Sequence, residues 1–90
     1  DSMAAGARLA LSTLGIDPQT KLIVGIDYIP EAREAIRQGQ QAATFTYPTA
    51  GAEGAEVALK ILAGETVPRE IEVPSQMVTK ENVETVDTVF

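Results

Sequence analysis

The chain contains neither cysteine nor histidine. Without cysteine it has no disulfide, thiol nucleophile or thiolate metal ligand. Without histidine it has no Ser-His-Asp triad, Cys-His pair or His-ligated zinc site. The remaining carboxylate pairs, such as Glu31 with Glu34, have helical spacing on surfaces that we expect to be exposed. We therefore predict a binding protein and not an enzyme, with no catalytic residue, no metal site and no cofactor.

Aromatic residues, basic residues and long apolar runs are also scarce. Aromatic side chains make up 4% of the chain, so the core must consist mainly of aliphatic residues. The longest apolar run, residues 22–26, is far shorter than the roughly 18 residues that span a bilayer. Seven basic residues against thirteen acidic ones give a net charge of −6, and the basic residues form no cluster. A nucleic acid partner is therefore excluded, because phosphates require clustered Lys and Arg.

Three segments have helical patterns, and each is followed by a glycine that suits a helix end. We expect these helices over residues 2–14, 30–38 and 49–63. Pro30 fits the first turn of the second helix, where a missing N–H costs nothing. Thr49 is the expected N-cap of the third helix.

Three strand-like runs alternate with these helices. The continuous apolar run 22–26 predicts a strand buried on both faces, as in a parallel sheet. A second strand is expected over residues 43–47, and a third near Ile71 and Val73, where apolar and charged residues alternate. Strands that alternate with helices favour right-handed βαβ units. We therefore predict the α/β class with a parallel sheet.

Asp27 is the residue that best fits a ligand site. It ends the apolar strand and comes just before the helix that Pro30 begins. In open α/β sheets, ligands bind outside the carboxyl ends of the strands. A carboxylate there can accept hydrogen bonds from two ligand hydroxyls. The alternative is an aspartate that caps the helix or supports the turn.

Five segments, taken together, resemble a known family. They are residues 1–7 (DSMAAGA), 23–27 (IVGID), 35–44 (AIRQGQQAAT), 62–68 (LAGETVP) and 78–83 (VTKENV). In this order and spacing they resemble the C-terminal part of the ribose-type sugar-binding proteins of ABC transporters. The resemblance implies the type I periplasmic-binding-protein fold, in which three crossing segments join two α/β lobes and the cleft between the lobes holds the sugar.

The resemblance also implies a division of the chain. Residues 1–47 would lie mainly in one lobe, 48–70 would contain a helix of the other lobe, and 71–90 would form the return crossing and the tail. The crossing segments would then be residues 42–48 and 71–78. The chain is accordingly expected to be a fragment of a longer protein, whose missing N-terminal portion completes the cleft. Alone, the fragment is expected to bind sugar weakly or not at all and to self-associate.

The function implied by the resemblance is non-catalytic capture of a sugar or similar polyol. The protein would be periplasmic or otherwise extracytoplasmic, and its partner would be the membrane permease of an ABC importer. Asp27 would be the sugar-contacting aspartate. Tyr47 stands where many relatives have glutamine. Its ring and hydroxyl suit either a sugar contact or packing at the hinge.

Two other classes of protein compete with this interpretation. The same fold occurs in the ligand-sensing domains of two-component receptors and of lactose-repressor-like transcription regulators. The ending at residues 78–83 resembles the transport proteins more than the repressors. A small α/β enzyme or receiver domain is the other class. A receiver needs an acidic cluster near its first strand and a lysine late in the fold, and the sequence has neither arrangement.

Overall fold

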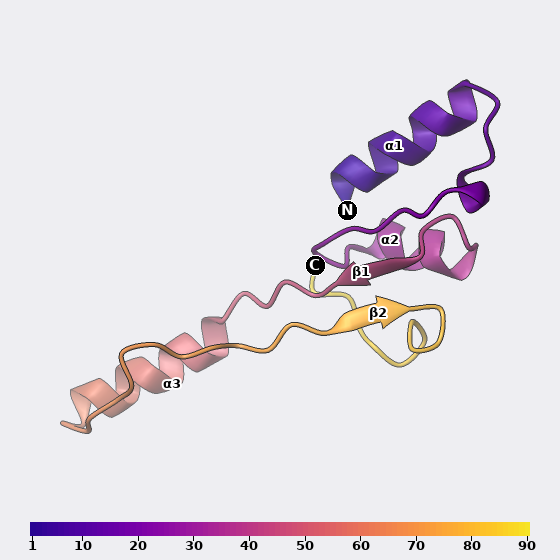
Figure 1. Cartoon of the computed structure of the whole chain (residues 1–90). Helices are drawn as coiled ribbons and strands as arrows, with labels where there is room; N and C mark the ends of the chain where they lie inside the picture. Colours follow the sequence, from indigo (N-terminus) through magenta and orange to yellow (C-terminus); the bar gives the residue numbers. More distant parts are fainter.

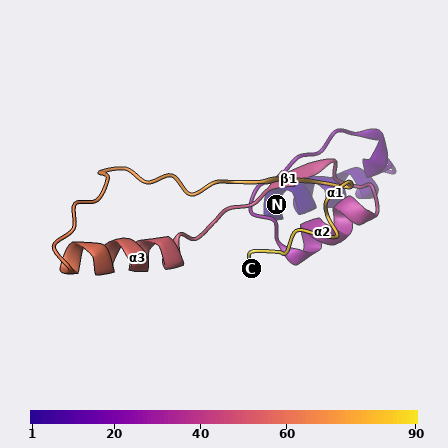
Figure 2. The ribbon, with the colours of Figure 1, turned by 90° about the horizontal axis from the view of Figure 1, so that it is seen from below.

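A computed structural model describes all of residues 1–90, and it has two unequal parts (Figure 1). The molecule is elongated, with principal extents of 61 × 23 × 17 Å. The smaller part contains α3 (Gly51–Leu62), at the far end of two extended segments. The larger part contains α1 (Ser2–Thr13), the 3₁₀ helix η1 (Pro18–Thr20), α2 (Pro30–Arg37), β1 (Ala43–Phe45) and β2 (Met77–Thr79). The view from below shows the same separation of α3 from the other elements (Figure 2).

The segment before α2 runs parallel to the strand after it. Val24 pairs with Ala43, and Asp27 pairs with Thr46, in two isolated parallel bridges. Because α2 connects the two paired segments, these elements form a βαβ unit. The α/β class predicted from the sequence is confirmed.

The third predicted strand, around Ile71 and Val73, is wrong. The nearest strand is β2, which pairs with β1 in antiparallel register, so that Val78 lies opposite Thr44. Ile71 and Val73 lie instead beside α3, where they line a depression together with Val57 of that helix. A helix offers no free backbone groups for strand pairing, so residues 71–73 stay extended without a ladder.

The predicted burial of residues 22–26 on both faces is also wrong. Leu22 is 85% exposed, Val24 50% and Ile26 54%. These three alternate residues point to one side of the segment. Val24 and Ile26 line an open depression next to the first turn of α1, and this side of the segment therefore stays accessible.

The three predicted helices are confirmed, with small differences at their ends. Gly15, Gly39 and Gly64 follow the helices with φ between 74° and 80°, a conformation that favours glycine. The N-cap of α3 is Ala50 in a left-handed conformation, not Thr49, and no side chain caps it. None of the helices is long and apolar enough to cross a membrane.

A small core lies between α2 and the C-terminal segment. Tyr28, Ile36, Val78 and Val83 form one buried cluster. The Tyr28 hydroxyl lies 3.2 Å from the carbonyl oxygen of Val83 and 2.9 Å from that of Val86. The aromatic ring thus connects the turn before α2 to the C-terminal segment, through packing and through hydrogen bonding.

Candidate ligand-binding site

The chain turns sharply where the parallel segment ends and α2 begins. Asp27 has φ 106° and Tyr28 has φ 57°, so two consecutive residues with side chains are in a region that glycine normally occupies. Such conformations are unfavourable by about 1–3 kcal/mol each, and they persist only where the surroundings impose them. Pro30 then begins α2.

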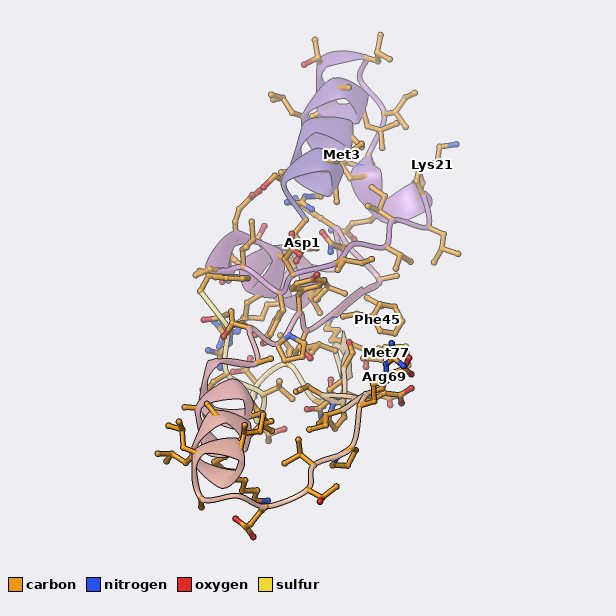
Figure 3. All side chains as sticks on the ribbon, turned by 90° about the vertical axis from the view of Figure 1, so that its left-hand side faces the viewer. Asp1, Met3, Lys21, Phe45, Arg69 and Met77 are labelled. Atoms are coloured by element: carbon orange, nitrogen blue, oxygen red, sulfur yellow. The ribbon has the colours of Figure 1, made fainter.

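Hydrogen bonds hold this turn on two sides. On one side, the main-chain N–H of Asp27 donates to the carbonyl of Phe45 at 2.8 Å. On the other, the carboxylate of Asp1 accepts from the main-chain N–H of Tyr28 at 2.7 Å and from that of Ile29 at 3.4 Å. Asp1 lies at the base of α1, next to the remainder of the larger part (Figure 3). The turn is therefore fixed between β1 and the start of α1.

The side chain of Asp27 is left available by this arrangement. It is 47% exposed, and its carboxylate accepts no hydrogen bond from the chain. Its Oδ2 atom lies 3.9 Å from the main-chain nitrogen of Asp1. The N-cap of α2 is Ile29, and no side chain caps that helix. The side chain of Asp27 therefore makes no hydrogen bond that caps α2. Both of its carboxylate oxygens can accept hydrogen bonds from a ligand.

Asp27 lies at the edge of an apolar depression of about 520 Å³. The first turn of α1, residues 24–27 and Phe45 line it. Val24 and Ile26 supply much of its apolar wall, and Phe45 is 37% exposed. An apolar wall beside a few polar acceptors is typical of small-molecule sites. The ring of Phe45 also offers a flat face against which a sugar ring can pack.

Tyr47 lies in a second, neighbouring depression of about 560 Å³. It is 60% exposed, and its hydroxyl makes no hydrogen bond within the chain. The two depressions share Ile26 and Phe45 in their linings. Asp27 and Tyr47, the two residues singled out from the sequence, are therefore on adjoining surfaces but do not line one common pocket.

Asp1 is a site component that the sequence interpretation missed. Besides the turn, its carboxylate accepts from Gln41 Nε2 at 2.9 Å and from Thr44 Oγ1 at 2.9 Å to both oxygens. Arg8 donates to the side-chain oxygen of Gln41, and it also donates to Glu31 at 2.6 Å. These five side chains, which we call the Asp1 network, connect α1, α2 and β1.

One residue in the sequence, Gly25, gave an indication of this network. A Cβ atom on residue 25 would overlap Oδ1 of Asp1 and would lie 2.9 Å from Gln41 Nε2. A glycine inside a strand-like run can mark such a close approach. The glycine alone did not indicate which side chains approach it, because Asp1 and Gln41 lie far apart in the chain and meet only after folding. No group of three His, Cys, Asp or Glu residues is arranged to hold a metal ion.

No family model matches the chain. Among curated proteins it is 39% identical over 83 residues to the ribose import binding protein of Salmonella typhimurium, which covers 90% of this chain and 27% of the relative. It is 35% identical over 85 residues to a putative rhizopine-binding protein of Rhizobium meliloti, covering 92% of this chain and 28% of the relative.

The fold has close counterparts among solved structures. An ABC transporter periplasmic solute-binding protein of Actinobacillus succinogenes, with bound D-allose, matches with a TM-score of 0.83 and 31% identity over 96% of this chain and 30% of that protein. An ABC transporter solute-binding protein of Bacillus halodurans, with bound myo-inositol, matches with a TM-score of 0.78 and 37% identity over 93% of this chain and 29% of that protein. The fructose-binding periplasmic domain of a hybrid two-component system matches with a TM-score of 0.75 and 30% identity over 90% of this chain and 28% of that protein.

These proteins are much longer than the chain, which spans 27% of the length of the ribose import relative and 30% of the allose-binding one. The likeness nevertheless covers nearly the whole chain and extends to both sequence and fold. The relatives are binding proteins, and the ligands that they are named for or contain are sugars or polyols. In sequence and fold, the chain therefore matches one part of a ribose-type periplasmic sugar-binding protein.

Proposed function

We propose that the chain forms one side of the binding cleft of a two-lobe solute-binding protein that captures a sugar or similar polyol for an ABC-type importer. The observation that supports the proposal most strongly is the position and exposure of the Asp27 carboxylate. This carboxylate is half-exposed and accepts no hydrogen bond from the chain, and it stands at the end of a parallel segment beside an apolar depression. Two carboxylate oxygens suit two adjacent hydroxyls, and each such charge-assisted bond contributes about 1.5–3 kcal/mol.

The division into lobes follows the same proposal. Residues 1–47 would lie mainly in one lobe, 48–70 would carry α3 into the other, and 71–90 would return and form the tail. Two features support this division. No residue of α3 is buried, as expected of a helix whose partners are elsewhere. The extended segments that lead to α3 and away from it are bonded together at Thr46, whose carbonyl accepts from Ser75 Oγ at 2.6 Å.

The ligand would lie between Asp27 and the exposed ring of Phe45. Val24 and Ile26 would pack against the apolar face of the sugar ring, while Asp27 accepts from its hydroxyls. Tyr47 would contact the ligand from the neighbouring surface, beyond Ile26 and Phe45. This role needs no bond-breaking chemistry, and the relatives are named as binding proteins.

The proposed partner is the membrane permease of an ABC importer, and the proposed location is the periplasm or another extracytoplasmic compartment. The allose-bound relative is described as a periplasmic protein of an ABC transporter. A second candidate function is sensing, because the fructose-binding match is the periplasmic domain of a two-component system. Uptake of labelled sugar by cells with and without the gene separates the two. Lost uptake supports transport, whereas normal uptake with lost sugar-dependent transcription supports sensing.

The test of the binding role uses the full-length protein that carries the chain. Calorimetry with ribose, allose, myo-inositol and fructose should identify at least one ligand. Asp27→Ala should weaken its binding roughly 100-fold, because two charge-assisted hydrogen bonds are lost. Glu65→Gln is the matched control, since this exposed carboxylate follows α3, which lies at the other end of the molecule from α1 and β1 (Figure 1). Unchanged affinity in Asp27→Ala would refute the role of Asp27.

The isolated 90 residues provide a second test. They contain only one side of the proposed cleft, so ligand hydroxyls that face the absent side would stay hydrated. We expect weak binding or none. Micromolar or tighter binding of a monosaccharide by the isolated chain would contradict the two-sided cleft.

A further inference from the structure

The turn that presents Asp27 is unfavourable by itself and depends on its neighbours. Two consecutive residues, Asp27 and Tyr28, have positive φ. A chain released from this turn would relax towards ordinary backbone angles and would carry the carboxylate of Asp27 to another position. Something outside the turn must therefore fix it.

Asp1 is placed to do this. Its side chain is the only one that bonds to the main chain of the turn, through the N–H groups of Tyr28 and Ile29. Asp1 is 9% exposed, so water competes little for its oxygens. The side chains of Gln41 and Thr44 hold the carboxylate in turn. Gln41 and Thr44 therefore fix the carboxylate of Asp1, and this carboxylate in turn fixes the backbone of the turn.

The pattern of donors requires a carboxylate and not an amide. Every group that faces the two oxygens of Asp1 is a donor: the two main-chain N–H groups, Gln41 Nε2 and Thr44 Oγ1. An ionised carboxylate accepts at both oxygens, whereas an asparagine has one acceptor and one NH₂ donor. In Asp1→Asn, the NH₂ group would face another donor in either orientation, with almost no change in side-chain size.

We infer that Asp1 is a positioning residue for ligand binding: its buried carboxylate holds the strained turn at residues 27–28, and the turn aims the carboxylate of Asp27 at the ligand. This inference rests on the proposed sugar-binding function. It adds a residue that does not touch the ligand but sets the geometry of one that does. Such supporting hydrogen bonds determine how accurately a contacting group is held.

The experiment is a double-mutant cycle in the full-length protein, with the sugar identified by calorimetry as probe. The variants are Asp1→Asn, Asp27→Ala and the two combined. We expect Asp27→Ala to weaken binding roughly 100-fold and Asp1→Asn roughly tenfold. In the Asp27→Ala background, Asp1→Asn should change the affinity less than about twofold, because the group that it positions is gone.

Two further variants separate positioning from general destabilisation. Asn82→Ala removes the hydrogen bonds of the Asn82 side chain with Thr79 and Met77, which do not involve the turn, so it should lower the melting temperature while leaving affinity within about twofold. Thr44→Val removes one donor to Asp1 and keeps the side-chain shape. It should weaken binding several-fold, again only when Asp27 is present, and it serves if Asp1→Asn fails to fold.

The outcomes are distinct. If Asp1→Asn and Thr44→Val lower the melting temperature but leave affinity unchanged, while Asp27→Ala weakens binding, the positioning role is overturned and the binding function stands. If Asp1→Asn weakens binding equally with and without Asp27, the role is overturned as well. If Asp27→Ala binds like the wild type, the proposed ligand contact of Asp27 fails, and the positioning role of Asp1 fails with it. If none of the sugars binds the full-length protein, the proposed function itself fails.

Discussion

The backbone of Gly25 passes so close to the carboxylate of Asp1 that any side chain at residue 25 would overlap Oδ1. Gly25→Ala should therefore displace a carboxylate that four donor groups hold in place. Because the displaced groups lose hydrogen bonds in a buried setting, we expect a loss of about 2–3 kcal/mol in the free energy of unfolding. Urea denaturation of wild type and variant measures the difference.

Gly6→Ala is the matched control for this prediction. Gly6 lies inside α1, and a Cβ atom there would meet nothing within 4 Å. Alanine is favoured over glycine in a helix interior by up to about 1 kcal/mol. We expect Gly6→Ala to be neutral or stabilising. Equal losses from both substitutions would show that the close approach at Gly25 has no special effect.

Asp27→Gly should change affinity and stability in opposite directions. The substitution removes the proposed ligand contact, so affinity should fall roughly 100-fold, as in Asp27→Ala. It also places glycine at φ 106°, where a residue with a side chain is strained. We therefore expect Asp27→Gly to be more stable than Asp27→Ala by about 1 kcal/mol. Calorimetry of binding and thermal unfolding of both variants test the pair. Lower stability in Asp27→Gly would mean that the turn carries no strain.

The sequence predicted those parts of the fold that depend on local patterns. Helix α2 is an example, because Pro30 fixes its start and Gly39 its end. The strand predicted near Ile71 failed because alternation of apolar and charged residues does not supply a pairing partner. The burial predicted for Val24 failed because a continuous apolar run does not say whether an element of this chain covers it.

The candidate site was predictable only in part, for a related reason. Asp27 could be singled out because ligands generally bind at the carboxyl ends of parallel strands in α/β folds. The role of Asp1 could not, since its contacts with Gln41 and Thr44 join residues 40 and 43 positions apart. Sequence patterns describe neighbours along the chain, whereas this network exists only through tertiary folding.

Tyr28 should make the stability of the chain fall at alkaline pH. Burial of the phenol raises the pKa of Tyr28 above its usual value of 10.0, although Arg33 and Arg37 partly oppose the shift. The folded state therefore holds this proton more tightly than the unfolded state. The resulting stability is fully present below about pH 10 and is lost as pH rises through the folded-state pKa. The phenolate also cannot donate to the carbonyls of Val83 and Val86.

Tyr28→Phe isolates this effect. Phenylalanine keeps the ring in the core but has no proton to lose. Urea denaturation between about pH 8 and pH 11 should show a steeper loss of stability for wild type than for Tyr28→Phe. Parallel profiles for the two proteins would contradict the assignment to Tyr28.

The isolated chain should self-associate through α3. Leu59 is 67% exposed and Leu62 83% exposed, and no residue of this helix is buried. Exposed apolar surface of this kind favours association between copies, and exchange of α3 between two chains through the extended segments is one route. Leu62→Lys should reduce association without harming the helix, because a cation is favourable in the last helical turn. Met3→Lys on α1 is the control, since Met3 is 91% exposed but lies in the other part of the molecule. Sedimentation velocity over a range of concentrations should show larger species for wild type and Met3→Lys than for Leu62→Lys. A wild-type chain that stays monomeric at high concentration and melts cooperatively would show that α3 needs no partner.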